Sequence, residues 1–293
     1  MKRADFLKLI ALTPFSMAAM KLNTLKNIVS ELPNSTKMPV LFLGHGSPMN
    51  AIEENEFVSG FREIGKKIEQ PKAILVVSAH WETKGTYVTA MEKPRTIHDF
   101  GGFPKALYDI QYPAPGDPEL ANEIKNRVTS TTIGLDVNWG LDHGAWTVIK
   151  HLYPNANIPV IQFSLDYTKG PEYHYALSKE LAYLRKKGVL IVGSGNMVHN
   201  LGLVAWDKLN ETYGYDWALE ASEKMKSLLL NGNHAPLIHY RNQGRAFDLS
   251  VPTPEHFLPL LYVLGLQEKS DTVQLFNDKP LAGSLTMTSV KIG

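Results

Sequence analysis

Histidine is the residue type in this chain that is best suited to hold a catalytic metal. The sequence contains ten histidines and no cysteine, so disulfides and thiolate metal sites are excluded. Any transition metal must therefore be bound by imidazole or carboxylate groups. Three histidines, His45, His80 and His199, come shortly after apolar runs that are typical of strands. Because a catalytic metal needs three protein ligands and one open position, this recurrence indicates a metal site.

A single histidine after a strand is more often a hydrogen-bonded structural residue than a ligand, so the prediction depends on the recurrence. A fourth candidate, His256, follows Glu255 in a segment where Thr253 is expected to cap a helix that begins at Pro254. Adjacent helical residues point about 100° apart, so His256 and Glu255 are not expected to bind the same ion. The spacing alone leaves open which of the two is the ligand.

The elements that position these histidines are those of a single α/β domain with a central, mostly parallel sheet flanked by helices. Near-continuous apolar runs predict strands that are covered on both faces, at residues 39–43, 73–78, 86–91, 159–165 and 189–192. Helical periodicity predicts helices at 172–187 and 215–230. Open α/β sheets bind their ligands beyond the carboxyl ends of the strands, so the metal site is expected there.

A long segment without clear periodicity lies at residues 94–118, which contain five prolines and several aromatic residues. This composition is typical of a functional loop or lid. His98 and Asp99 would reach a bound substrate if the loop closes over the site, and His98 is therefore a candidate substrate contact. The alternative is a rigid surface loop without a role in the chemistry.

The charge balance argues against nucleic acid or an anionic membrane as a partner, since 30 Lys plus Arg stand against 29 Asp plus Glu. Residues 1–37 are interpreted as a signal-like or disordered extension, and the folded domain is expected to span 38–293. Ala4 follows Arg3 where a twin-arginine export signal has its second arginine. This departure slightly favours the cytoplasm, with export to the periplasm as the alternative. The apolar stretch before residue 21 is too short to span a membrane.

Seven stretches of the chain, in the same order, resemble the DOPA extradiol dioxygenases of bacteria and plants, which are class III extradiol ring-cleavage dioxygenases. Together they are highly specific, and they extend across residues 39–267. They are Gly44-His45-Gly46-Ser47-Pro48, Ser78-Ala79-His80-Trp81, His98-Asp99-Phe100-Gly101-Gly102-Phe103-Pro104, Tyr112-Pro113-Ala114-Pro115-Gly116, Asp142-His143-Gly144-Ala145-Trp146, Gly193-Ser194-Gly195-Asn196 with His199-Asn200-Leu201, and Thr253-Pro254-Glu255-His256.

The resemblance implies one divalent metal ion per chain, zinc or Fe(II), bound by His45, His80 and His256. It implies that His199 is a fourth ligand or an acid/base beside the metal. His143 is the second acid/base candidate, and a role in orienting a ligand or the substrate is an equal alternative. Ring opening by oxygen needs a metal that changes its oxidation state, which zinc does not do, so Fe(II) is expected for activity.

The resemblance further implies that the chain inserts both atoms of O2 into a catechol-type ring. The substrate would be L-DOPA or a related compound, cleaved at the 4,5 position to a ring-opened semialdehyde. The partners are then a small aromatic diol and O2, and the oligomeric state stays open. The histidines alone allow two alternatives: a zinc-dependent hydrolase of an amide or ester, and a non-enzymatic binding protein on the same scaffold.

Overall fold

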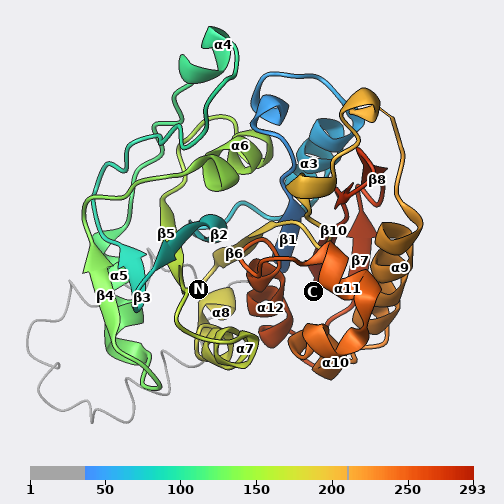
Figure 1. The fold of residues 1–293 in the computed structure, drawn as a ribbon. Helices are drawn as coiled ribbons and strands as arrows, with labels where there is room; N and C mark the ends of the chain where they lie inside the picture. Colours follow the sequence, from blue (N-terminus) through green and yellow to red (C-terminus); the bar gives the residue numbers. More distant parts are fainter. Residues whose placement is uncertain (1–36, 210) are drawn as a thin grey trace, which may run out of the picture. The chain divides into compact units, whose positions relative to one another are not determined.

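The computed structural model describes residues 37–209 and 211–293, so residues 1–36 of the predicted extension lie outside the described part (Figure 1). An eight-stranded sheet with the strand order β4-β3-β5-β2-β6-β1-β10-β7 forms the centre of the domain. The strands β8 and β9 form a separate two-stranded sheet. The strands are β1 (Val40–Gly44), β2 (Ala73–Thr83), β3 (Thr86–Thr89), β4 (Ile133–Asp136), β5 (Val160–Asp166), β6 (Val189–Gly195), β7 (Val273–Phe276), β8 (Pro280–Leu281), β9 (Leu285–Thr286) and β10 (Ser289–Ile292).

The middle of the large sheet is parallel, because β5 pairs with β2, β2 with β6 and β6 with β1 in that sense. The strands β1, β5 and β6 are buried along their whole length, which explains their near-continuous apolar sequences. At one edge β10 and β7 add antiparallel pairs. The predicted α/β fold with a mostly parallel sheet is confirmed, whereas the sequence patterns do not predict β4, β7 or β10.

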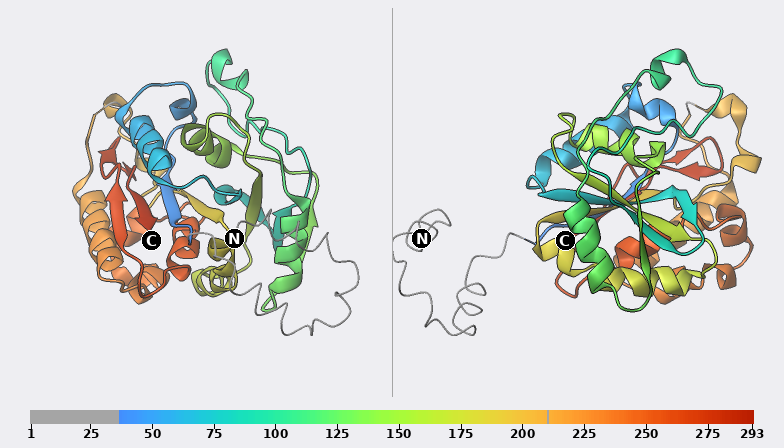
Figure 2. Two further views of the ribbon diagram at one scale, coloured as in Figure 1. Left: turned by 180° about the vertical axis from the view of Figure 1, so that it is seen from behind. Right: turned by 90° about the vertical axis from the view of Figure 1, so that its left-hand side faces the viewer.

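Helices cover both faces of the sheet because the side chains of each strand alternate between the faces. In β1, Val40 and Phe42 belong to one core cluster, and Leu41 and Leu43 belong to the other. Figures 1 and 2 show α7, α8 and α12 on the face of the sheet that carries Val40 and Phe42. The helices α3 and α6 lie on the opposite face, which carries Leu41 and Leu43. These helices are α3 (Glu56–Lys67), α6 (His143–Leu152), α7 (Pro171–Glu180), α8 (Tyr183–Lys186) and α12 (Leu258–Gly265).

The other helical segments are shorter or lie toward the edges of the domain. They are α4 (Lys105–Tyr108), α5 (Pro118–Arg127), α9 (Asp216–Leu230), α10 (Ala235–Ile238) and α11 (Arg245–Ser250), with the 3-10 helices η2 (Pro48–Ala51), η3 (Leu201–Leu203), η4 (Trp206–Lys208) and η5 (Tyr240–Gln243). Among the described residues, no helix combines the length and the apolar character that a membrane span requires.

Two predicted helices differ from the observed ones. The predicted helix 172–187 is divided into α7 and α8, because the amides of Leu181 and Leu184 donate to carbonyls three residues earlier, which tightens the turn. The helix predicted to begin at Pro254 is wrong, since α12 begins at Leu258. The hydroxyl of Thr253 donates to Glu255 Oε1 at 2.8 Å, so it is used within the preceding turn instead of capping a helix.

A buried ion pair joins α8 to the loop between α12 and β7, and its arginine also bonds to the segment before β1. Arg185 is fully buried, and its Nη1 donates to Asp271 Oδ2 at 2.6 Å and to the carbonyl of Leu266 at 2.8 Å. Its Nε donates to the carbonyl of Met38 at 2.8 Å. Lys37 Nζ also donates to Asp271, at 2.6 Å. These bonds fix the segment that leads into β1, and therefore the strand that ends just before His45.

Replacing Asp271 with asparagine should lower the free energy of unfolding by about 3 kcal/mol, because the guanidinium of Arg185 would stay buried without its counter-charge. Urea unfolding of the purified protein measures this change. The matched control is Asp109→Asn, which breaks an exposed pair with Lys105 and should change stability by less than about 1 kcal/mol. Equal effects of the two replacements would contradict a structural role for the buried pair.

Candidate metal centre

Two of the candidate ligands lie at the carboxyl ends of strands that both pair with β6. His45 directly follows β1, and His80 lies in the last part of β2, within the register irregularity between Val77 and Glu82. The Nε2 atoms of His45 and His80 are 3.2 Å apart. Two nitrogen ligands at about 2.0–2.1 Å from one tetrahedral ion are themselves about 3.3 Å apart. The pair therefore has the spacing that a shared metal ion needs.

His256 approaches the same point from the turn before α12. Its ring centroid lies 5.3 Å from that of His45 and 5.0 Å from that of His80. One ring nitrogen from each of the three residues lies within 4.8 Å of the other two. A Cβ at Gly195 would come within 2.1 Å of the carbonyl oxygen of His256, so glycine is required at the end of β6 for this approach.

The other ring nitrogens of the three histidines face polar groups. His45 Nδ1 lies 3.1 Å from Ser194 Oγ, and His256 Nδ1 donates to Glu255 Oε1 at 3.1 Å. Outer partners of this kind fix the tautomer and the orientation of a metal-binding imidazole. They leave the Nε2 atoms available, so the three residues fit a single metal ion. Glu255 lies on the Nδ1 side of His256, an arrangement that favours His256 over Glu255 as the ligand beside His45 and His80.

The electrostatics of the cluster also suit metal binding. Burial, followed by the neighbouring histidines, lowers the pKa of His45 well below its usual value and the pKa of His80 to about 2. Both imidazoles are therefore neutral near pH 7, which is the form that binds a metal. Burial acts to raise the pKa of Glu255, but hydrogen bonds from His256 and Thr253 outweigh it and lower that pKa to about 2.

His199 lies beside the cluster on a loop after β6. Its backbone amide donates to the carbonyl of Ser250 at 2.8 Å, and its ring stacks on His256 with the centroids 3.5 Å apart. Burial, followed by the charge of His256, lowers the pKa of His199 to about 3. A second group of close ligand atoms consists of His199, Glu255 and His256. This position suits either of the two predicted roles, a fourth ligand or an acid/base.

His143 lies on the other side of the cluster, beside His80, with the two ring centroids 3.9 Å apart. It is the first residue of α6, whose N-cap is Asp142. Asp99 Oδ2 lies 2.9 Å from His143 Nδ1, and Asp99 Oδ1 accepts the backbone amide of His143 at 2.8 Å. Burial acts to raise the pKa of Asp99, but these contacts with His143 outweigh it and lower that pKa. Asp99 therefore stays ionised beside the His143 ring and fixes the backbone at the start of α6.

His98, the predicted substrate contact, does not line the cavity that contains the cluster. Its Nε2 donates to the carbonyl of Ile110 at 3.0 Å, and its ring packs against Trp146. Within the predicted loop 94–118, which contains α4, Asp99 and Phe100 contact His143, and Phe103 lines the cavity. His98 thus supports the loop that carries Asp99.

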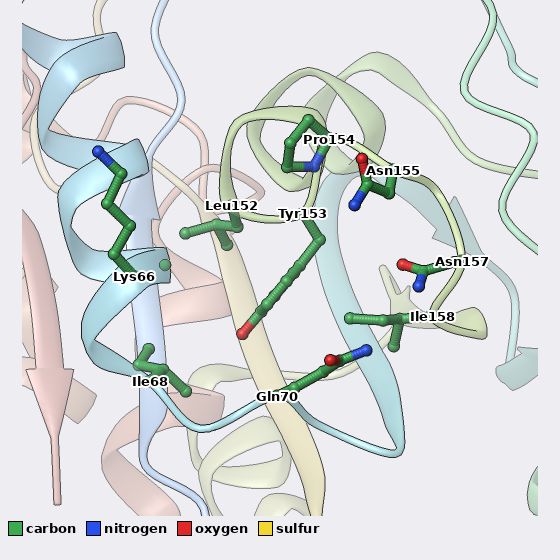
Figure 3. A pocket seen from close by; sticks show the side chains of 10 residues that line it. Lys66, Ile68, Gln70, Leu152, Tyr153, Pro154, Asn155, Asn157 and Ile158 are labelled. Atoms are coloured by element: carbon green, nitrogen blue, oxygen red, sulfur yellow. The ribbon is translucent and has the colours of Figure 1, made fainter.

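One cavity of about 980 Å³ is lined by all the histidines of the cluster, namely His45, His80, His143, His199 and His256. A second hollow of about 230 Å³ lies near the ends of α3 and α6 (Figure 3). The smaller hollow has Lys66, Tyr153 and Asn155 in its lining but no histidine or carboxylate. The histidine chemistry of the described residues therefore belongs to the larger cavity.

Asn196 is a site residue to which sequence reasoning gives no role. It lines the large cavity, is 1% exposed, and its Nδ2 donates to the carbonyl of Thr286 at 2.7 Å. Its Oδ1 has no hydrogen-bond partner among the described residues. A buried acceptor without a partner is costly, and a ligand donor would satisfy it. The position of Asn196 directly after the glycine that ends β6 is the one sequence signal that could have identified it.

The chain is similar to known ring-cleaving enzymes over most of its length. Residues 38–287 match the family described as the catalytic LigB subunit of aromatic ring-opening dioxygenase. Over 264 residues the chain is 47% identical to a 4,5-DOPA dioxygenase extradiol of Escherichia coli K12, which covers 89% of this chain and 96% of that protein. A protein of the same name from Beta vulgaris is 36% identical over 261 residues, which are 85% of this chain and 94% of that protein.

A solved structure supports the same relationship. The crystal structure of an uncharacterised Escherichia coli K12 protein superposes with a TM-score of 0.75 at 41% sequence identity, covering 87% of this chain and 100% of that one. The sequence matches extend through the segments that carry His45, His80, His143, His199 and His256. The chain therefore belongs to the family of the catalytic LigB subunit of aromatic ring-opening dioxygenases, and it is an extradiol ring-cleavage dioxygenase.

Proposed function

We propose that residues 38–293 form a dioxygenase domain that binds Fe(II) through His45, His80 and His256. The domain would open a catechol-type ring next to the diol, as in 4,5-cleavage of an L-DOPA-like compound, to give a semialdehyde. The observation that carries this proposal is the convergence of three imidazoles, with one ring nitrogen from each within 4.8 Å of the others, in a large cavity. When bound there, Fe(II) would supply electron transfer between diol and oxygen, which zinc lacks.

Two histidines outside the triad are proposed to handle protons. Ring opening needs a proton to leave a substrate hydroxyl and a proton to return later, and imidazole suits both steps. His143 lies beside His80 and is held by Asp99, whereas His199 lies beside His256. Each is thus next to a different proposed ligand and within the lining of the same cavity.

Asn196 is proposed to orient the substrate. Its amide is fixed by the bond to Thr286, which leaves the Oδ1 acceptor in the cavity lining without a partner. A substrate hydroxyl that keeps its proton would donate to this oxygen. The buried acceptor would then be satisfied only when a diol is bound, which favours a hydroxylated ring over a ring without a hydroxyl group.

The proposed function is tested by metal reconstitution. Metal-free protein is loaded with Fe(II) or with zinc in the absence of oxygen, and catechols including L-DOPA are then added with oxygenated buffer. We expect the Fe(II) form to consume oxygen and to give a product that absorbs visible light, and the zinc form to do neither. Equal ring cleavage by a pure zinc form would contradict the role of Fe(II). Absence of oxygen uptake with every catechol would favour the hydrolase alternative.

A further inference from the structure

The large cavity has an excess of negative charge in its lining. Four glutamates line it, and among the described residues no lysine or arginine does. Two of the glutamates are paired with basic residues outside the lining, Glu54 with Arg62 and Glu56 with Lys279. The other two, Glu53 and Glu211, are exposed and have no ion-pair partner in the part of the chain that the structure describes. Two uncompensated carboxylates therefore face the cavity.

An apolar surface accompanies these carboxylates. Leu201, Val204, Trp206 and Leu209 line the same cavity on the segment that leads to Glu211. Trp206 is 71% exposed and Leu201 is 59% exposed, so this apolar surface is open to solvent. The cavity lining thus combines the histidines with an apolar surface and negative charge, which suits a short hydrocarbon chain that ends in a cation.

A separate observation indicates that this cavity takes a polar ligand. The buried Oδ1 of Asn196, which has no partner, lies in the same lining as the five histidines. A catechol whose diol is bound at His45, His80 and His256 has its ring substituent directed away from these residues. Such a substituent would meet other residues of the lining, which include Glu53 and Glu211.

We infer that the substrates of this enzyme are catechols whose side chain is cationic or uncharged, such as catechol amines, and that catechols with an anionic side chain are disfavoured. An ammonium group would be attracted by Glu53 and Glu211. A carboxylate would lose part of its hydration without finding a basic partner in the lining, and the two glutamates would repel it. This inference concerns the substrate class of the proposed ring-cleaving site and therefore rests on the proposed function.

The test compares four catechols that share the diol and differ in side-chain charge. They are dopamine as the cation, 4-(2-hydroxyethyl)catechol as the neutral compound, 3,4-dihydroxyphenylacetate as the anion, and L-DOPA as the zwitterion. Dissociation constants are measured by calorimetry on the zinc-loaded full chain without oxygen, and kcat/KM is measured by oxygen uptake with the Fe(II) form. Dopamine should have a dissociation constant at least about tenfold lower, and a kcat/KM at least about tenfold higher, than 3,4-dihydroxyphenylacetate, and raised salt should reduce both differences.

The double variant Glu53→Gln with Glu211→Gln assigns the selectivity to these residues. It should reduce the preference for dopamine over 3,4-dihydroxyphenylacetate severalfold. The dissociation constant and kcat/KM of the neutral compound should stay unchanged. The matched control, Glu69→Gln with Glu119→Gln, removes two exposed carboxylates that do not line the cavity and should keep the preference. A preference that is absent in the wild type, or that is unchanged in the cavity variant, would overturn the inference.

The outcomes separate this inference from the proposed function. Oxygen uptake with all four catechols and no order by charge would overturn the inference and support the proposed function. The expected order in calorimetry without oxygen uptake by the Fe(II) form would support the inference about the cavity and contradict ring cleavage. No binding and no uptake with any catechol would overturn both.

Discussion

Replacing His256 with alanine should weaken metal binding at least about 100-fold and abolish ring cleavage, because one of three converging imidazoles is removed. Loss of an outer-shell partner typically costs about 10- to 100-fold in affinity, and loss of a ligand costs more. Metal content after dialysis against a weak chelator measures the effect. A thermal melt of the metal-free variant shows whether the fold persists.

The matched control for this replacement is Glu255→Gln, which changes the adjacent residue and keeps its size. Glu255 holds Nδ1 of His256 at 3.1 Å but is not expected to bind the ion. We expect Glu255→Gln to retain one metal ion per chain with about 10- to 100-fold weaker affinity. If Glu255→Gln lost the metal while His256→Ala kept it, the carboxylate would be the ligand and the proposed triad would be wrong.

Replacing His143 with glutamine should lower kcat about 10²- to 10⁴-fold, the usual contribution of a general acid or base, while the metal content stays unchanged. His143 lines the cavity and lies beside His80 without belonging to the proposed triad. Steady-state oxygen uptake with the Fe(II)-loaded variant separates kcat from KM. A large rise in KM with kcat unchanged would instead indicate a residue that only binds substrate.

Asp99→Asn provides the companion test for this role. Asparagine keeps the size of the side chain but loses the charge that lies 2.9 Å from His143 Nδ1. The single replacement should lower kcat about 10- to 100-fold, by analogy with other partners that orient a functional imidazole. When combined with His143→Gln it should add little, because the two residues act as one unit. Fully additive losses would contradict the coupling between Asp99 and His143.

The sequence predicts the central part of the fold well because buried parallel strands have distinctive compositions. The runs in β1, β5 and β6 consist mostly of Val, Ile, Leu and Phe, and these strands are buried along their whole length. The strands β4 and β7, which the sequence patterns do not predict, are shorter and less buried. Both β4 and β7 have four residues that are mostly only half-buried, so no continuous apolar run marks them. Their identity as strands depends on the neighbours with which they pair.

For the candidate site, strand ends identify His45 and His80, since a parallel sheet brings such ends together. The local structure around His256 is not predictable from the same rules, because Thr253 bonds to Glu255 and the helix begins later. The pairing of Asp99 with His143 joins residues that are 44 positions apart. No local pattern encodes such a contact, which depends on how the loop before α4 packs against α6.

The proposed reaction of this chain is insertion of oxygen into a catechol ring through a histidine-bound Fe(II). The most direct test is a single turnover of the Fe(II)-loaded protein with dopamine or L-DOPA under dioxygen labelled with heavy oxygen, followed by mass spectrometry of the product trapped before solvent exchange. We expect a ring-opened product that carries both labelled atoms, and no such product from the His256→Ala variant. A product without label, or an unopened ring from the fully Fe(II)-loaded wild type, would contradict the proposed reaction.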